Sequence, residues 1–75
     1  MVISLKCFAQ LGVYLPENAE AYALHPGDTV AAVVEWLGLP QAEVKLVFVN
    51  GLKAGFDTVL KDGDRLGLFP AVGGG

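Results

Sequence analysis

The sequence has very few of the residues that cross-link small domains through disulfides or metal ions. Its 75 residues include one cysteine, Cys7, and one histidine, His25. A single cysteine cannot form an intrachain disulfide, and a small domain without disulfides is typical of a reducing compartment. One histidine without a partner cysteine does not make a zinc site. We therefore expect a cytoplasmic domain that holds no metal.

Positive charge is also scarce. Five Lys and Arg residues stand against eight acidic residues, which gives a formal net charge of −3, and the basic residues are scattered along the sequence. Nucleic-acid binders instead cluster Lys and Arg to neutralise phosphates. No apolar run approaches the ~20 residues that a membrane-spanning helix needs, and no signal-peptide pattern opens the chain. We therefore expect neither nucleic acid nor a membrane among the partners.

The sequence contains no P-loop, no dinucleotide fingerprint and no Ser-His-Asp set, so we do not expect an independent enzyme. Hydrophobic residues, by contrast, are abundant: they make up 53% of the chain, and the mean hydropathy is +0.52. A domain of this size buries only roughly 60% of the surface that its unfolded chain exposes. Part of the apolar surplus should therefore form an exposed patch, and large patches usually mark partner sites.

The first half of the chain predicts two strands and one helix. Residues 2–8 alternate between apolar and polar side chains, which indicates a half-buried strand, and residues 21–25 form a weaker strand candidate after a loop. Asp28 is a suitable N-cap, and Gly38 is placed to end the helix before Pro40. The helix between them carries one apolar stripe, formed by Val30, Val33, Val34 and Leu37.

The second half predicts three strands. Residues 44–49 are strongly β-prone, and Asn50-Gly51 is a hairpin turn that leads into a short return strand over residues 52–54. Asp62-Gly63 is a second turn, after which residues 64–69 form a last strand that stops at Pro70. The order strand, strand, helix, strand, strand, strand indicates an α+β fold in which a mixed sheet of four to five strands packs on one main helix.

This element order and four short segments resemble the MoaD/ThiS-like family of ubiquitin-like sulfur carriers. The segments are Phe8-Ala9-Gln10, Asp62-Gly63-Asp64, Phe69-Pro70 and Gly74-Gly75. The resemblance covers the whole chain and is closest to the small subunit of molybdopterin synthase, although Gly73 makes three terminal glycines instead of two. It implies a β-grasp domain over residues 1–70 and a flexible glycine-rich tail over residues 71–75.

The resemblance also implies a chemistry for the tail. A ubiquitin-activating-type adenylyltransferase would use ATP and Mg to adenylate the Gly75 carboxylate, and the carrier itself would bind no cofactor. A sulfur donor of the cysteine desulfurase or rhodanese type would then give a thiocarboxylate on Gly75. The molybdopterin synthase large subunit, or another sulfur-accepting enzyme, would receive the sulfur. Gly73 and Gly74 would let the tail enter a narrow channel, because they have no side chains.

Three alternatives remain open at this point. The carrier could serve thiamine or another sulfur-containing metabolite. The chain could be a ubiquitin-like protein modifier that is attached to lysines through Gly75. It could also be a β-grasp interaction module with an inert tail.

Strand alternation predicts a docking surface for the partners. If Ile3, Leu5 and Cys7 face the core, then Cys7 is a small core residue, and the alternate positions of its strand face outward. The same rule applied to the other two long strands gives an outer apolar patch with a basic rim. The patch would consist of Phe8, Val47, Val49 and Phe69, and the rim of Lys6, Lys45 and Arg65. The sequence does not decide whether Trp36 covers the core or makes a second contact.

Overall fold

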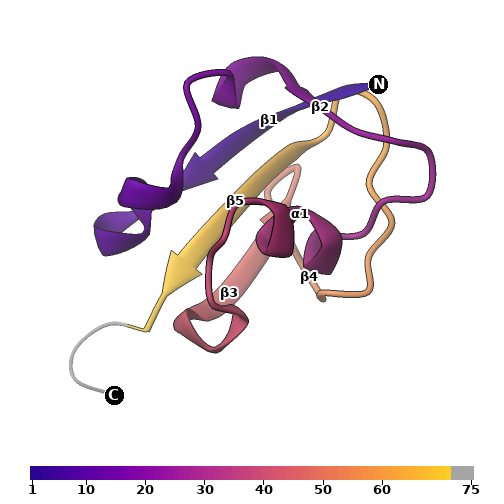
Figure 1. Ribbon diagram of the computed structural model, residues 1–75. Coiled ribbons are helices and arrows are strands. Elements are labelled where there is room, and N and C mark those ends of the chain that lie inside the picture. Colours follow the sequence, from indigo (N-terminus) through magenta and orange to yellow (C-terminus); the bar gives the residue numbers. More distant parts are fainter. Residues whose placement is uncertain (72–75) are drawn as a thin grey trace.

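In the computed structural model, which describes residues 1–71, five strands form one sheet and a short helix covers one of its faces (Figure 1). The strands occur along the sheet in the order β2-β1-β5-β3-β4. They are β1 (Val2–Cys7), β2 (Tyr22–Ala23), β3 (Val44–Val49), β4 (Leu52–Ala54) and β5 (Arg65–Pro70), and the helix is α1 (Val30–Trp36). The predicted α+β class, mixed sheet and element order are therefore confirmed.

The two end strands of the chain pair in the middle of the sheet. β1 and β5 run parallel, with Leu5 opposite Leu66 and Cys7 opposite Leu68, whereas the β1–β2, β3–β5 and β3–β4 pairs are antiparallel. The connections contain three short 3-10 helices: η1 (Ala9–Tyr14), η2 (Ala19–Ala21) and η3 (Gln41–Glu43). The loop predicted for residues 10–19 thus contains helical turns that sequence patterning did not indicate.

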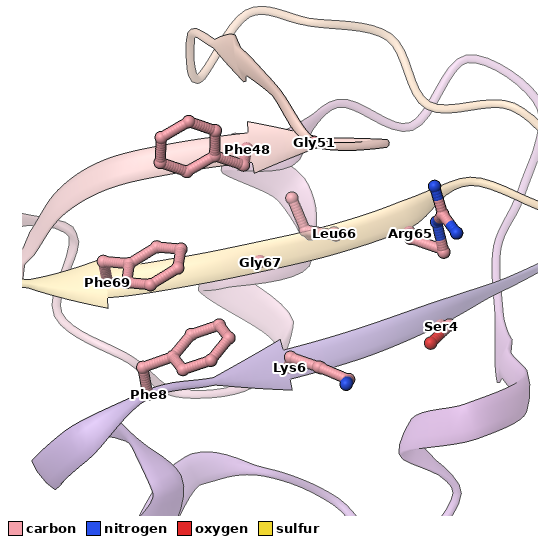
Figure 2. A pocket seen from close by; sticks show the side chains of 9 residues that line it. All are labelled: Ser4, Lys6, Phe8, Phe48, Gly51, Arg65, Leu66, Gly67 and Phe69. Atoms are coloured by element: carbon pink, nitrogen blue, oxygen red, sulfur yellow. The ribbon is translucent and has the colours of Figure 1, made fainter.

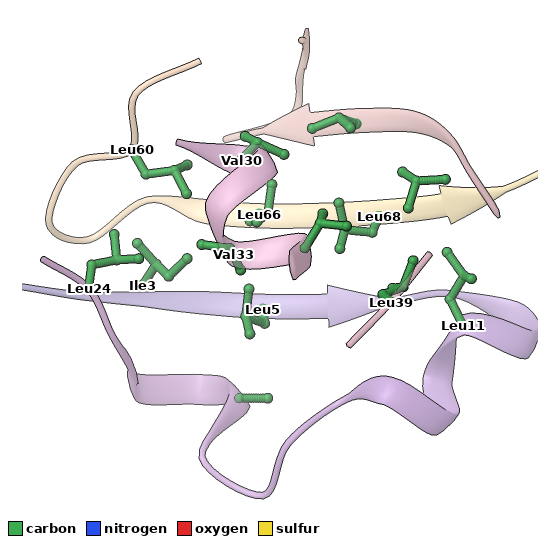
Figure 3. Packing of buried hydrophobic residues seen from close by; sticks show 14 residues of the cluster. Ile3, Leu5, Leu11, Leu24, Val30, Val33, Leu39, Leu60, Leu66 and Leu68 are labelled. Carbon is green, nitrogen blue, oxygen red and sulfur yellow. The ribbon is translucent and has the colours of Figure 1, made fainter. Parts of the chain in front are cut away.

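The core lies between α1 and the sheet face that it covers (Figure 3). Val30, Val33 and Val34 of α1 pack among Leu66 and Leu68 of β5, and all five side chains are almost fully buried. Burying each such side chain stabilises the fold by roughly 1.5–3 kcal/mol. No polar or charged residue is buried among residues 1–71, so the side chains between α1 and the sheet interact through apolar packing. The predicted apolar stripe of the helix is confirmed.

The start of the helix differs from the expectation by one residue. Thr29 is the N-cap, because its Oγ1 accepts a hydrogen bond from the Ala32 N–H at 3.2 Å. The Asp28 carboxylate instead accepts from the His25 N–H at 2.9 Å and so closes the turn before the helix. The prediction of Asp28 as N-cap was therefore wrong, whereas Gly38 ends the helix as expected, with a φ of +73°.

A hydrogen-bonded clamp joins the two predicted turns. Asn50 has a φ of +55°, as the hairpin turn requires, and its side-chain oxygen accepts from the Arg65 N–H at 2.9 Å. Its Nδ2 donates to Asp64 Oδ1 at 2.9 Å, and Asp64 Oδ2 accepts from the Lys61 N–H at 2.8 Å. Asp62 accepts from the Val2 N–H at 2.8 Å. The clamp fixes the register of β5 between β1 and β3.

Candidate functional site

The face of the sheet opposite α1, here called the outer face, carries a shallow hollow at its centre (Figure 2). The hollow has a volume of about 480 Å³. Its lining comes from the outward positions of β1 and β5, the β5 residue Leu66, the residue after β1, the end of β3 and the hairpin turn. The lining residues are Ser4, Lys6, Phe8, Phe48, Gly51, Arg65, Leu66, Gly67 and Phe69.

Three phenylalanines form an aromatic cluster at one end of this hollow. The rings of Phe8 and Phe69 are stacked, with centroids 4.1 Å apart and planes inclined by 6°. The ring of Phe48 meets Phe69 edge-on, with centroids 5.4 Å apart. Such pairs are worth about 0.5–1.5 kcal/mol beyond the area that they bury. Phe8 keeps 38% of its surface exposed, so the cluster is an ordered apolar surface that remains accessible.

Gly67 forms the floor of the hollow. A Cβ atom at this position would lie 3.5 Å from the rings of both Phe8 and Phe69, which is ordinary van der Waals contact. The site is therefore hollow because residue 67 has no side chain, and not because the backbone is distorted there. A glycine within a strand often marks a place where another chain or a ligand approaches closely.

The outer face differs from the predicted patch along β3. The register of β3 against β5 shifts between Val44 and Leu46, so Lys45 is an extra residue that reverses the alternation after it. Val47 is 3% exposed in the core, and Val49 packs against the core from the same side. The prediction that Val47 and Val49 face outward was therefore wrong, and Phe48 takes their place beside Phe69.

Along β1 and β5 the side chains lie as the alternation predicts. Lys6 and Arg65 are exposed and line the hollow, and Phe8 and Phe69 form its aromatic end. Lys45 is exposed, but it lies at the irregularity of β3 and does not line the hollow. The role of these residues in partner binding stays a prediction.

The one cysteine faces the core, as expected. Cys7 lies opposite Leu68 and packs against the buried cluster, and this burial raises the pKa of its thiol above the ordinary value. A raised pKa leaves less thiolate at neutral pH, which makes the residue a poor nucleophile. Among residues 1–71, no three His, Cys, Asp or Glu side chains come together in a metal-binding arrangement.

Sequence reasoning missed Phe48 and Gly67. Phe48 could not be found, because no signal in residues 44–49 marks the shift that turns it outward. Gly67 did have a signal, since it interrupts an apolar strand between Leu66 and Leu68. Gly73, Gly74 and Gly75 lie outside the described residues. The chain reaches them from Pro70, the last residue of β5, directly after the aromatic Phe69.

Trp36, which the sequence left undecided, is 61% exposed at the end of α1. Its ring lies 5.4 Å from that of His25, which is also exposed. None of the helices within residues 1–71 is long and apolar enough to cross a membrane.

Comparison with known proteins places the chain in a family. The family model described as Mut7-C ubiquitin matches residues 1–73. A crystal structure of SAMP1 from Haloferax volcanii is 23% identical, with a TM-score of 0.73 and full coverage of both chains. A crystal structure of H. volcanii small archaeal modifier protein 1 is 22% identical, with a TM-score of 0.70, and the match covers 93% of this chain and 97% of that one.

No curated protein matches. The likeness to the two crystal structures confirms the ubiquitin-like β-grasp fold that the sequence indicated, with its five-stranded mixed sheet and single α-helix. The chain belongs to the Mut7-C ubiquitin family.

Proposed function

We propose that this protein is a sulfur carrier whose Gly75 carboxylate is adenylated, converted to a thiocarboxylate and used as a sulfur donor, in the synthesis of molybdopterin. One observation carries the proposal. The central strand β5 ends at Pro70 beside the exposed aromatic cluster, and the sequence continues through Ala71 and Val72 to Gly73, Gly74 and Gly75. A partner that binds the outer face would therefore hold the start of the tail next to its own active site.

The chemistry explains why an activating partner is needed. An α-carboxyl group has a pKa of about 3.3–3.7, so at neutral pH it is an anion and a poor electrophile. In the proposed first step a Gly75 oxygen attacks the α-phosphorus of Mg-ATP and releases pyrophosphate. The outer sulfur of a persulfide on the donor then attacks the acyl carbon and expels AMP. A thiol finally cleaves the resulting acyl disulfide, which leaves the thiocarboxylate on Gly75 and a disulfide on the donor.

The domain would contribute reach and docking to this reaction. The five residues after Pro70 span about 17 Å when extended, at roughly 3.3–3.6 Å per residue. Ordering them in a channel costs about 1–2 kcal/mol per residue in backbone entropy. Binding through Phe8, Phe48 and Phe69, with Lys6 and Arg65 at the rim, would offset that cost. Lys45, at the irregularity of β3, is a weaker candidate for the same rim.

A ubiquitin-like protein modifier is the second candidate, because the chain shares its fold with a small archaeal modifier protein. The activated Gly75 carbonyl would then be attacked by a lysine amine of a target protein and not by sulfur. The two functions share the activating step and differ in the nucleophile. Conjugates of higher mass in cell extracts would favour the modifier.

The test is the intact mass of the protein after incubation with a candidate adenylyltransferase, Mg-ATP and a persulfide donor. The mass of the protein isolated from its source first tests whether Gly75 is the last residue. A gain equal to the exchange of one oxygen for sulfur, lost on deletion of Gly75, is the expected result. Adding one residue after Gly75 should abolish the gain without changing the stability of the domain. An unchanged mass in the intact chain would contradict the proposal.

A further inference from the structure

The outer face has a charge opposite in sign to that of the whole chain. Strand pairing places Lys6 and Gly67 side by side, Arg65 beside Ser4, and Lys53 beside the outward Phe48. Three of the five basic residues thus gather on one face, although they are far apart in the sequence. The acidic residues occupy α1, the 3-10 helices η2 and η3, the turns and the loops, and none stands at an outward position of a strand. Glu20 of η2 lines a second hollow with Lys6 but makes no ion pair with it.

The basic side chains of this face have no acidic partner within 4.0 Å in the part of the chain that the structure describes. Among residues 1–71, the one ion pair within 4.0 Å joins His25 to Asp28, on another part of the surface. Asp62 and Asp64, which precede β5, use their carboxylates to accept hydrogen bonds from the N–H groups of Val2 and Lys61. The charge of Lys6, Lys53 and Arg65 is therefore available to an incoming molecule.

The hollow has an apolar end and a basic end. Figure 2 shows the three phenyl rings toward the end of β5, Arg65 and Ser4 toward its start, and Lys6 between them. Gly67 lies between the two ends, and the rings of Phe8 and Phe69 border the space above it on the apolar side. The apolar end is the one from which the chain continues toward the tail.

We infer that the outer face binds an acidic segment of a partner protein, which inserts one apolar side chain over Gly67 and presents carboxylates to Lys6 and Arg65. The inference deepens the proposed function, on which it rests for the identity of the partner, an adenylyltransferase. An apolar centre with a charged rim is the usual form of a protein interface. Complementary charge at the rim speeds association and selects the partner.

Two other occupants fit the face less well. Single-stranded nucleic acid also stacks on aromatic side chains, but three cations neutralise only about three phosphates, and the net charge of −3 opposes binding. A second copy of the chain would set Lys6 and Arg65 against the same residues of its partner, and like charges at an interface are costly.

Charge reversal tests the inference against a matched control. Arg65→Glu changes the outer face, whereas Lys61→Glu makes the same change of charge at an exposed position outside the hollow. Both are made in the full chain and titrated without ATP, so that binding is measured apart from chemistry. The probe is the purified adenylyltransferase, titrated by calorimetry at low and high salt. We expect Arg65→Glu to weaken binding about 10-fold or more, with less dependence on salt, and Lys61→Glu to weaken it less than about 2-fold.

The hollow is tested separately with Gly67→Ala, whose new methyl group fits beside both rings. This variant should keep its unfolding midpoint and bind the adenylyltransferase several-fold more weakly. The inference would be overturned if the Arg65 and Lys61 variants bound the adenylyltransferase equally well. It would also be overturned if the unsubstituted chain did not bind the adenylyltransferase. A labelled single-stranded oligonucleotide that binds tightly and is released by Arg65→Glu would overturn it too.

The two proposals fail in different ways. If the thiocarboxylate forms but Arg65→Glu does not change the affinity for the adenylyltransferase, the carrier function stands and the acidic-partner inference is wrong. If binding depends on Arg65 but the intact chain gains no sulfur, the docking inference stands and the carrier function falls.

Discussion

The two faces of β5 carry similar residue types in very different environments. Leu66 and Leu68 point toward α1 and are almost completely buried, whereas Gly67 and Phe69 point toward the hollow of the outer face. Both faces carry apolar residues, and both are ordered by contacts with β1 and β3. The difference is that the inner face is covered by a helix of the same chain, while the outer face is not. Residue type alone therefore does not distinguish a core from a binding surface.

The largest expected effect comes from truncating one side chain on each face. Leu68→Ala removes a fully buried side chain and should lower the free energy of unfolding by about 2–5 kcal/mol. Phe69→Ala removes a partly exposed ring and its two aromatic contacts, so it should cost less stability but weaken partner binding by about 2 kcal/mol or more. Urea unfolding measures the first quantity, and calorimetric titration of the adenylyltransferase measures the second.

Two results together would contradict this difference between the faces. Both substitutions would lower the free energy of unfolding equally, and Phe69→Ala would leave partner binding unchanged. Phe69 would then belong to the core in energetic terms, despite its position on the outer face.

The next effect concerns the hydrogen-bonded clamp around Asn50. The clamp fixes the register of β5 and so determines which of its side chains lie on each face. Asn50→Ala removes both side-chain hydrogen bonds and leaves a non-glycine residue at a φ of +55°. We expect a loss of about 2–3 kcal/mol in the free energy of unfolding. Asn50→Gly is the matched control, since it removes the same bonds without the backbone strain, and it should cost about 1 kcal/mol less. Equal losses would mean that strain contributes nothing.

A smaller effect is expected at the residue that turns the chain from the outer face into η1. Ala9 has a φ of +51°, an unfavourable conformation for a residue with a Cβ atom. Ala9→Gly should therefore raise the free energy of unfolding by about 0.5–1 kcal/mol, and Ala9→Val should lower it. Thermal unfolding measures both. Destabilisation by glycine would show that the Ala9 methyl group makes a contact that outweighs the strain.

The smallest effect concerns the pH dependence of stability that Cys7, the last residue of β1, contributes. Burial raises the pKa of its thiol above the ordinary value of 9.0, so the folded protein binds this proton more tightly than the unfolded chain. The corresponding stability is fully present below pH 9 and is lost as the pH rises through the folded pKa. Cys7→Ala should flatten the decline in urea stability above pH 9. An identical decline in both proteins would place the thiol in solvent.

Much of the fold could be predicted because local signals in the sequence agree with one another. The valine stripe of α1, the Asn50-Gly51 turn and the alternation of β1 each fix one element, and their order leaves few topologies. The basic rim of the outer face was predicted in part. Strand alternation placed Lys6 and Arg65 there, whereas Lys53 was missed because its position depends on the pairing of β4 with β3. The basic residues scattered through the sequence become neighbours only when β1, β5 and β4 join one sheet.

The candidate site was predicted on β1 and β5 and missed on β3. A shift by one residue at Lys45 exchanges the faces of everything that follows, and nothing in the local sequence distinguishes a strand with such a shift from a regular one. The capping residue shows the same limit on a smaller scale. Asp28 and Thr29 are both good caps, and only the turn that His25 makes with Asp28 decides between them.

The position of β5 has a mechanical consequence. The strand that leads into the tail is bonded on both sides, to β1 in parallel and to β3 in antiparallel orientation. A force that pulls on the tail acts along β5, so its hydrogen bonds to both neighbours are loaded together in shear and cannot be opened one at a time. Pulling on the tail while β1 is held would therefore meet high resistance. In the proposed function, this resistance would let a partner draw the tail into its channel without unfolding the domain.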